Sequence, residues 1–326
     1  MSARITLCCV LALLLLPCQA VVAFTTVINA PPDSLAPLLQ GNVYVVGQGT
    51  QVNVSESRDF WEHSFFVSGG ELNVGSSTGS GVGVMVSDGG VVNVQDSNLY
   101  FMEVEDGGAA NLDSVGYAAP ITTFPGGQLS AKDSHLTVLD MRGGEADLHE
   151  VKVDLFGVNG NPGEGPAHAR VYGGELPVGD RSLAVGNLGT LEIHSVDYIE
   201  PAIWVVDPQG TLDVVGYDFA IDGASIDGLV QGEPYPIPEA DFTLTGRYAD
   251  GSPFEMLVSD SDPGFDLQGL HVESFGTVQV TLSVPEPTGL VLSSGVLALS
   301  AASRSRRVLV RRRACAERSS LSPLRP

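Results

Sequence analysis

The chain carries a short motif in which apolar and polar residues alternate, and each clear copy follows a pair of glycines. The best copies are residues 69–74 (GGELNV), 89–94 (GGVVNV) and 107–112 (GGAANL). Because successive residues of a strand point to opposite faces of a sheet, the two apolar residues around the polar one predict a short strand with one buried face. The glycines predict a corner before that strand, since glycine readily adopts the positive φ values of a sharp turn.

The motif recurs at a spacing that favours one kind of fold. Its central polar position occurs nine times over 160 residues, with a mean step of 20. A second apolar stretch precedes several of the corners, as in residues 65–67, 84–86 and 203–206. Each repeat therefore predicts strand, corner, strand and polar loop, the content of one coil of a parallel β-solenoid, or β-helix. The central positions are Asn53, Asn73, Asn93, Asn111, Ser130, Asp147, Pro177, Glu192 and Asp213.

We predict an all-β chain in which residues 24–239 form a solenoid of about ten coils of about 20 residues each. The outward polar residues would then stack from coil to coil. They are either ordinary solvent-facing residues or a binding face for polysaccharide or a divalent cation. One step of 30 residues predicts an inserted loop over residues 157–168, which is either a binding loop or a plain excursion.

The pattern changes after the solenoid. Three prolines in residues 231–238 mark a boundary. Beyond it, residues 241–245 and 277–282 alternate in the manner of antiparallel strands. We predict a small antiparallel β cap over residues 240–283, which would cover the open edge of the solenoid.

Residues 1–23 have the three parts of a secretory signal peptide. Arg4 supplies the positive charge, residues 5–16 form an apolar stretch of 12 residues, and small residues follow at Ala20 and Ala23. The apolar stretch is too short to span ~30 Å of hydrocarbon. We therefore predict export, with cleavage by signal peptidase after Ala23.

The other end of the chain combines a proline-rich motif, an uncharged stretch over residues 288–303, and a basic cluster directly behind it. The motif is Val284, Pro285, Glu286 and Pro287, and the cluster is Arg304, Arg306 and Arg307. Together with the export signal, this arrangement resembles the PEP-CTERM sorting tail of bacterial exported proteins. The two prolines keep the motif extended, as a processing enzyme requires.

The resemblance implies that residues 284–326 are a sorting tail whose motif is recognised by a membrane exosortase. It also implies an apolar, transmembrane-like helix at residues 288–303, with the arginines held on the cytoplasmic side by the positive-inside rule. The simpler alternative is a permanent C-terminal membrane anchor without processing.

The charge of the body limits its partners. Residues 24–283 contain 37 acidic and 7 basic residues, a formal net charge of −30. Such a body repels nucleic acid and anionic membranes and attracts cations. The four cysteines lie only in the two end segments, so no disulfide can stabilise the body.

The body shows no sequence motif of a catalytic site. Polysaccharide lyases with this fold need a base beside clustered carboxylates, and no spacing singles out one of Lys132, Arg142 and Arg170. Residues 260–266 (DSDPGFD) alternate carboxylates as calcium loops do, but they lack the closing glutamate and predict a weak Ca²⁺ site or an ordinary turn. The histidines lack metal-ligand spacing; they are His63, His135, His149, His168, His194 and His271.

These observations predict a non-enzymatic, exported protein of the cell envelope or extracellular matrix, with a structural, adhesive or carbohydrate-binding role. The expected partners are signal peptidase, exosortase and extracellular polysaccharide, with no nucleic acid and no required cofactor. The alternatives are a secreted polysaccharide-active β-helix enzyme and a permanently membrane-anchored surface protein.

Overall fold

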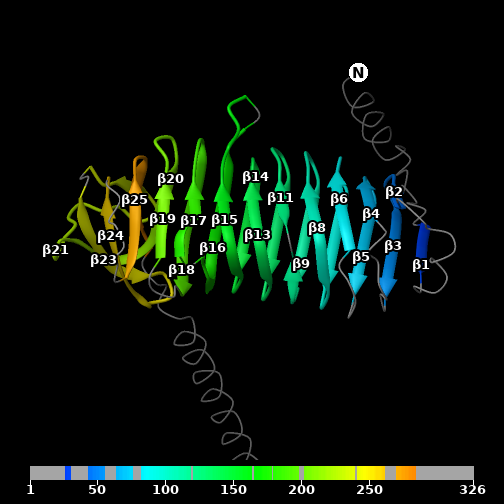
Figure 1. Ribbon diagram of the computed structural model, residues 1–326, viewed down its shortest axis with the longest axis horizontal. Helices are drawn as coiled ribbons and strands as arrows, with labels where there is room; N and C mark the ends of the chain where they lie inside the picture. Colours follow the sequence, from blue (N-terminus) through cyan, green and yellow to red (C-terminus); the bar gives the residue numbers. More distant parts are fainter. Residues whose placement is uncertain are drawn as a thin grey trace, which may run out of the picture.

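The computed structural model of the protein is an elongated, all-β solenoid (Figure 1). No helix occurs among the residues that the structure describes, and none that could cross a membrane is found there. The described residues are 26–30, 43–55, 64–75, 82–118, 120–163, 165–177, 179–197, 202–238, 241–260 and 269–283.

Two parallel sheets run along the length of the solenoid, here called sheet A and sheet B. Sheet A contains β1 (Thr26–Ala30), β3 (Thr50–Ser55), β5 (Glu71–Gly75), β7 (Val91–Gln95), β9 (Ala109–Asp113), β12 (Gln128–Lys132), β14 (Gly144–His149), β16 (Ala167–Glu175), β18 (Gly189–Asp197), β20 (Thr211–Ile221) and β26 (Thr277–Leu282). Sheet B contains β2 (Val43–Val46), β4 (Ser64–Ser68), β6 (Val82–Ser87), β8 (Asn98–Val104), β10 (Tyr117–Ala118), β11 (Ile121–Thr123), β13 (His135–Met141), β15 (Lys152–Val158), β17 (Gly179–Val185), β19 (Ala202–Val206) and β25 (Leu270–Ser274).

The predicted parallel β-solenoid is confirmed. Between Val82 and Ile221, seven turns follow one another, and each consists of a segment of sheet B and then a strand of sheet A. The earlier strands extend both sheets toward the N-terminus, with β1 pairing with β3 and β2 pairing with β4. The predicted total of about ten coils is not established, because part of the connections among these first strands lies outside the described residues.

The core lies between the two sheets and is filled by every second residue of each strand. In β5, for example, Leu72 and Val74 are buried while Asn73 faces outward. Strand pairing places Leu72 beside Val92 and Val92 beside Ala110, so the buried residues of sheet A form continuous rows along the solenoid. The alternation read from the sequence therefore has the expected cause, which is burial of one face of each strand.

The glycine pairs form the corners that lead from sheet B to sheet A, and their two members have different functions. Gly89 has a φ of +77° and open space around it, so it supplies the left-handed conformation of the turn. Gly90 is required because of crowding. A Cβ on Gly90 would lie 2.5 Å from the carbonyl oxygen of Val67 in the preceding turn.

The repeat assignment was wrong at one position. Arg170 pairs with Asp147 on one side and Glu192 on the other, so it occupies the position that was predicted for Pro177. The glycine pair 173–174 lies inside β16 and does not form the corner that precedes it. The insertion is accordingly shorter than predicted and covers residues 159–166, between β15 and β16, where it projects beyond the neighbouring corners (Figure 1).

After β20 the chain leaves the solenoid and then returns to it. It forms β21 (Ala224–Ser225), β22 (Pro234–Pro236) and an antiparallel hairpin of β23 (Phe242–Tyr248) and β24 (Pro253–Ser259). Strand β23 of the hairpin pairs antiparallel with β20, as an antiparallel cap would. However, β25 and β26 add parallel strands to sheets B and A, so residues 277–282 are antiparallel only to β22.

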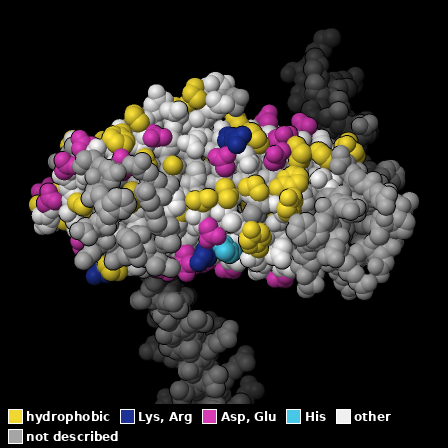
Figure 2. Space-filling model, in the orientation of Figure 1, with side chains coloured by type: hydrophobic (Ala, Val, Ile, Leu, Met, Phe, Trp, Pro, Cys, Tyr) yellow, Lys and Arg dark blue, Asp and Glu magenta, His cyan; other side chains and the backbone are white. Residues whose placement is uncertain are grey.

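The outer face of sheet B carries many apolar side chains, as Figure 2 shows. Leu155 is 50% exposed and lies in register with Val138 on the neighbouring strand. Ionisable groups on this side occur mainly as separate pairs, such as Lys152 with Glu175 and His135 with Asp154. The outer face of sheet A has a different composition, and the candidate functional site lies on it.

Candidate functional site

The outward positions of sheet A bring the central polar residues of the repeat into one row. Backbone pairing places each of them beside the next, from β3 to β26. The row consists of Asn53, Asn73, Asn93, Asn111, Ser130, Asp147, Arg170, Glu192, Asp213 and Gln279. The row changes character along its length, from amides to ionisable groups.

The amide part of the row is a hydrogen-bonded ladder. The Nδ2 atoms of Asn73, Asn93 and Asn111 each donate to the Oδ1 atom of the preceding asparagine, at 2.8 Å in all three cases. The predicted stacking of these residues is therefore confirmed. The ladder satisfies one donor and one acceptor on each interior amide and fixes the orientation of the side chains.

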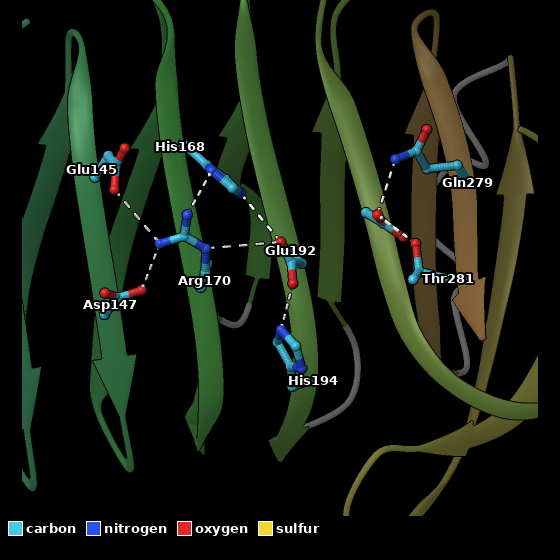
Figure 3. Close-up of polar contacts among 9 residues, drawn as sticks. Glu145, Asp147, His168, Arg170, Glu192, His194, Gln279 and Thr281 are labelled. Atoms are coloured by element: carbon cyan, nitrogen blue, oxygen red, sulfur yellow. Dashed lines mark hydrogen bonds and ion pairs between the residues drawn. The ribbon is translucent and has the colours of Figure 1, made fainter. Parts of the chain in front are cut away.

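The ionisable part of the row belongs to a group of six side chains on β14, β16 and β18, here called the ion-pair cluster (Figure 3). Its members are Glu145, Asp147, His168, Arg170, Glu192 and His194. Alternation along each strand brings two members of every strand to the outer face, since residues two apart point the same way. Parallel pairing then places the three strands side by side.

Arg170 lies at the centre of the ion-pair cluster. Its Nη1 atom donates to Asp147 Oδ1 at 3.0 Å and lies 3.7 Å from Glu145 Oε2. Its Nε atom is 4.0 Å from Glu192 Oε2. The hydrogen bond to Asp147 is the main cause of the raised pKa of Arg170, which keeps the guanidinium fully charged.

The contacts of His168 determine which of its two ring nitrogens accepts a hydrogen bond. Arg170 Nη2 lies 3.3 Å from His168 Nδ1, and because a guanidinium can only donate, Nδ1 is the acceptor. The proton of the neutral ring is then on Nε2, which donates to Glu192 Oε2 at 3.3 Å.

Glu192 is shared between two histidines. His168 contacts one of its carboxylate oxygens and His194 contacts the other. Hydrogen bonds from His168 and then His194 lower the pKa of Glu192 well below its usual range, against the opposing effect of burial. This carboxylate therefore stabilises the folded state above its unfolded pKa, and the stabilisation is lost as the pH falls toward the lower folded value.

A row of rings runs beside the ion-pair cluster. The rings of His149 and Tyr172 stack at 4.5 Å with an interplanar angle of 7°, and those of Tyr172 and His194 stack at 4.3 Å and 24°. The ring faces are directed at one another along the solenoid. Burial is the main cause of the raised pKa of the Tyr172 hydroxyl. Because the stacked ring faces cover one another, the ring edges, which carry the polar atoms, are the parts that this stacking leaves uncovered.

Asp213, the next member of the row on β20, is a buried carboxylate with 7% of its surface exposed. Its Oδ2 atom accepts hydrogen bonds from Gln279 Nε2 and Thr281 Oγ1, both at 2.9 Å (Figure 3). Its Oδ1 atom is buried and meets no hydrogen-bond donor in the part of the chain that the structure describes. Burial raises the pKa of Asp213, and the two hydrogen bonds only partly oppose this shift.

We predict that Asp213→Asn stabilises the protein at neutral pH. The amide oxygen keeps both hydrogen bonds, and the buried charge is removed. Because the pKa of Asp213 is raised in the folded state, the protonated side chain stabilises the fold at pH values below its unfolded pKa. This stabilisation is lost as the pH rises through the folded pKa. Thermal melting followed from pH 7 to pH 4 should show a gain that shrinks on acidification. Asp227→Asn, at an exposed loop position, is the control, and an unchanged melting curve for Asp213→Asn at pH 7 contradicts the prediction.

A surface pocket of about 350 Å³ adjoins the ion-pair cluster. It is formed where the corners before β12, β14 and β16 lie side by side, and Glu145 and His168 belong to both the pocket and the cluster. The inserted loop contributes Gly165 and Pro166 to the wall. The predicted loop is thus placed next to the most polar part of sheet A.

The remaining predicted residues lie elsewhere. Lys132 is paired with Asp133, and Arg142 lies on the sheet B side, where it contacts Asp140 and the Phe124 ring. The described residues contain no group of three or more histidine, cysteine, aspartate or glutamate residues arranged to hold a metal ion. The cleavage position Ala23, the motif residues 284–287, the arginines 304, 306 and 307, His63 and most of the acidic loop 260–266 lie outside the described residues.

Sequence inspection noted Arg170 as one of several basic candidates but missed the assembly around it. The signal was present as two alternating pairs, His168 with Arg170 and Glu192 with His194. The contacts between these pairs depend on the strand register that places Asp147, Arg170 and Glu192 side by side.

The side chains of the ion-pair cluster are held by hydrogen bonds and ion pairs to one another. Arg170 directs its donors at carboxylates and His168, and both nitrogens of His168 are engaged. The cluster contains three carboxylates and a single guanidinium. Such a surface suits a ligand rich in hydroxyl or cationic groups. Comparison of the chain with protein-family models, with curated proteins and with solved structures finds no match in any of the three.

Proposed function

We propose that the protein is exported to the cell envelope or extracellular matrix and binds polysaccharide there through the outer face of sheet A. The hydrogen-bonded amide ladder and the ion-pair cluster, which lie on this one face, are the observation that carries the proposal. A polysaccharide presents regularly spaced hydroxyl groups, and a β-solenoid presents one set of polar groups for every ~4.8 Å of its length. A linear glycan laid along the solenoid therefore meets polar side chains at every turn.

Affinity electrophoresis of the purified chain in gels that contain different soluble polysaccharides tests this binding. We expect at least one glycan to retard the protein, and we expect Asn93→Leu to weaken the retardation because it interrupts the amide ladder. A hydrophobic replacement on the opposite sheet, Thr122→Leu on β11, is the control for unspecific effects. Equal mobility in all gels contradicts the proposed function.

The proposal includes the two chain ends. The signal peptide of residues 1–23 directs export, and the PEP-CTERM-like tail of residues 284–326 is handled by an exosortase. We also infer that the solenoid has about ten coils. At the C-terminal end, we infer that residues 288–303 form an apolar helix that holds the protein in the membrane until processing. Support comes from the order of motif, uncharged stretch and arginines in the sequence.

Mass spectrometry of the exported protein tests the processing. We expect the mature form to start after Ala23 and to end near the motif Val284–Pro287, because the arginine-rich segment is removed. Replacing Glu286 by alanine should leave the tail attached. An exported protein that keeps its arginines would instead be a permanently anchored surface protein.

A polysaccharide-active enzyme is the second candidate. It is favoured by the position of Arg170 and His168 among carboxylates on an open face of a β-solenoid. Incubation with polyuronates and Ca²⁺, followed by ultraviolet absorbance of unsaturated products, separates the two functions. Product that disappears in Arg170→Ala would establish the enzyme, and the geometry of Arg170 leads us to expect none.

A further inference from the structure

The pocket beside the ion-pair cluster is built from equivalent positions of three successive turns. Gln128 on β12, Glu145 on β14 and His168 on β16 are in register, so their side chains follow one another across the sheet. The corners beside them contribute glycines and two prolines to the wall; the lining residues are Pro125, Gly126, Gly127, Gln128, Gly144, Glu145, Gly165, Pro166 and His168.

The lining combines features that suit a single saccharide unit. The volume of about 350 Å³ lies at the lower end of the range for pockets that bind small ligands, ~300–1,000 Å³. Pro125 and Pro166 offer aliphatic ring surface. Gln128 offers an amide donor and acceptor, and the glycine corners leave peptide groups uncovered by side chains.

The described part of the lining carries acidic charge. Among the described residues, Glu145 is the one carboxylate of the lining, and none of them is a lysine or arginine. Its nearest described cation, Arg170, lies 3.7 Å away and donates its shorter hydrogen bond, of 3.0 Å, to Asp147. The Glu145 side chain is 59% exposed. Its carboxylate is therefore only weakly neutralised and remains accessible to a ligand in the pocket.

We propose that this pocket is a subsite for an amino-sugar unit with a free ammonium group. In this assignment the ammonium group binds Glu145, and the hydroxyl groups bind Gln128 and the peptide groups of the corners. An anionic sugar such as a uronate is repelled, both by Glu145 and by the field of a body with a net charge of −30. The inference rests on the proposed polysaccharide binding and names the class of glycan.

Isothermal titration calorimetry of the purified full-length chain tests the assignment with four probes. These are glucosamine oligomers, the N-acetylated oligomers of the same length, galacturonate oligomers, and spermidine as a cation without a sugar ring. We expect the glucosamine oligomers to bind most tightly and galacturonate oligomers to give no heat. Glu145→Gln should weaken glucosamine binding about tenfold or more, because it replaces a charge-assisted hydrogen bond by a neutral one.

Glu103→Gln on β8 of sheet B is the matched control, since it removes one carboxylate from the opposite face. It should leave binding unchanged, and thermal melting of both variants confirms that they fold. The assignment is overturned if Glu145→Gln binds like the unmodified chain, if the neutral or anionic oligomers bind as tightly as the cationic ones, or if spermidine matches them. Binding of a neutral or anionic glycan alone leaves the proposed function intact. Binding of no glycan removes both.

Discussion

Replacing Trp204 by alanine is expected to lower the free energy of unfolding by about 3–5 kcal/mol. Trp204 is fully buried on the inner face of β19, between Leu183 of β17 and Val272 of β25. Its indole Nε1 atom lies 3.4 Å from the carbonyl oxygen of Pro177, so the substitution also removes the donor of that contact. No cysteine in residues 24–283 offers a disulfide to compensate.

Chemical denaturation of the full-length chain, followed by circular dichroism, measures this loss. Trp204→Phe is the matched control, because it keeps an aromatic ring in the core and should retain most of the stability. In a solenoid each turn contacts mainly its neighbours, so the C-terminal turns are expected to unfold before the rest in Trp204→Ala. A variant that unfolds at the same denaturant concentration as the unmodified chain would show that the core of this turn is not packed as described.

The second large effect is expected at a corner. Gly90→Val should destabilise the protein by about 1–3 kcal/mol or more, as overpacking does in a rigid surrounding. The new Cβ would lie 2.5 Å from the carbonyl oxygen and 2.9 Å from the carbonyl carbon of Val67. These are backbone atoms of the neighbouring parallel strand, so they move only if the two turns separate.

Gly89→Asn provides the contrast for this prediction. Gly89 has a φ of +77°, and a Cβ at this position would meet no other atom within 4 Å. Asparagine tolerates the left-handed region better than other residues do. We expect this variant to change the melting temperature only slightly. Comparable losses for the two variants would mean that the close approach of two turns at Gly90 is not the larger constraint at this corner.

The sequence pattern was most informative where the same local constraint, burial of one face of each strand, acts in every turn. Leu72 and Val74 are apolar around Asn73 because one face of each strand is buried, and this alternation identifies strands without any knowledge of the fold. The spacing of the glycine pairs then predicted coils and parallel stacking, and the asparagine ladder followed from the equal steps between Asn53, Asn73 and Asn93.

The sequence misled where a loop changed the spacing. The triplet Ala169–Arg170–Val171 has the required alternation, but no glycine pair precedes it, and the pair at 173–174 shifted the assignment to Pro177. Arg170 was thereby removed from the predicted row. The residue at the centre of the ion-pair cluster was therefore hidden by the irregular loop that also forms part of the adjoining pocket.

Local alternation and repeat spacing were sufficient to identify the class of fold and the outward asparagines, whereas the export and sorting signals at the two ends stay predictions. Which ionisable groups meet follows only from the folded chain. Asp147, Arg170 and Glu192 are separated by 23 and 22 residues, and their contact depends on the register of three strands. The burial of Asp213 likewise depends on β26, which returns to the solenoid 66 residues later. Burial and charge pairing are set by neighbours in space, and a repeat of variable length does not specify those neighbours until the chain is folded.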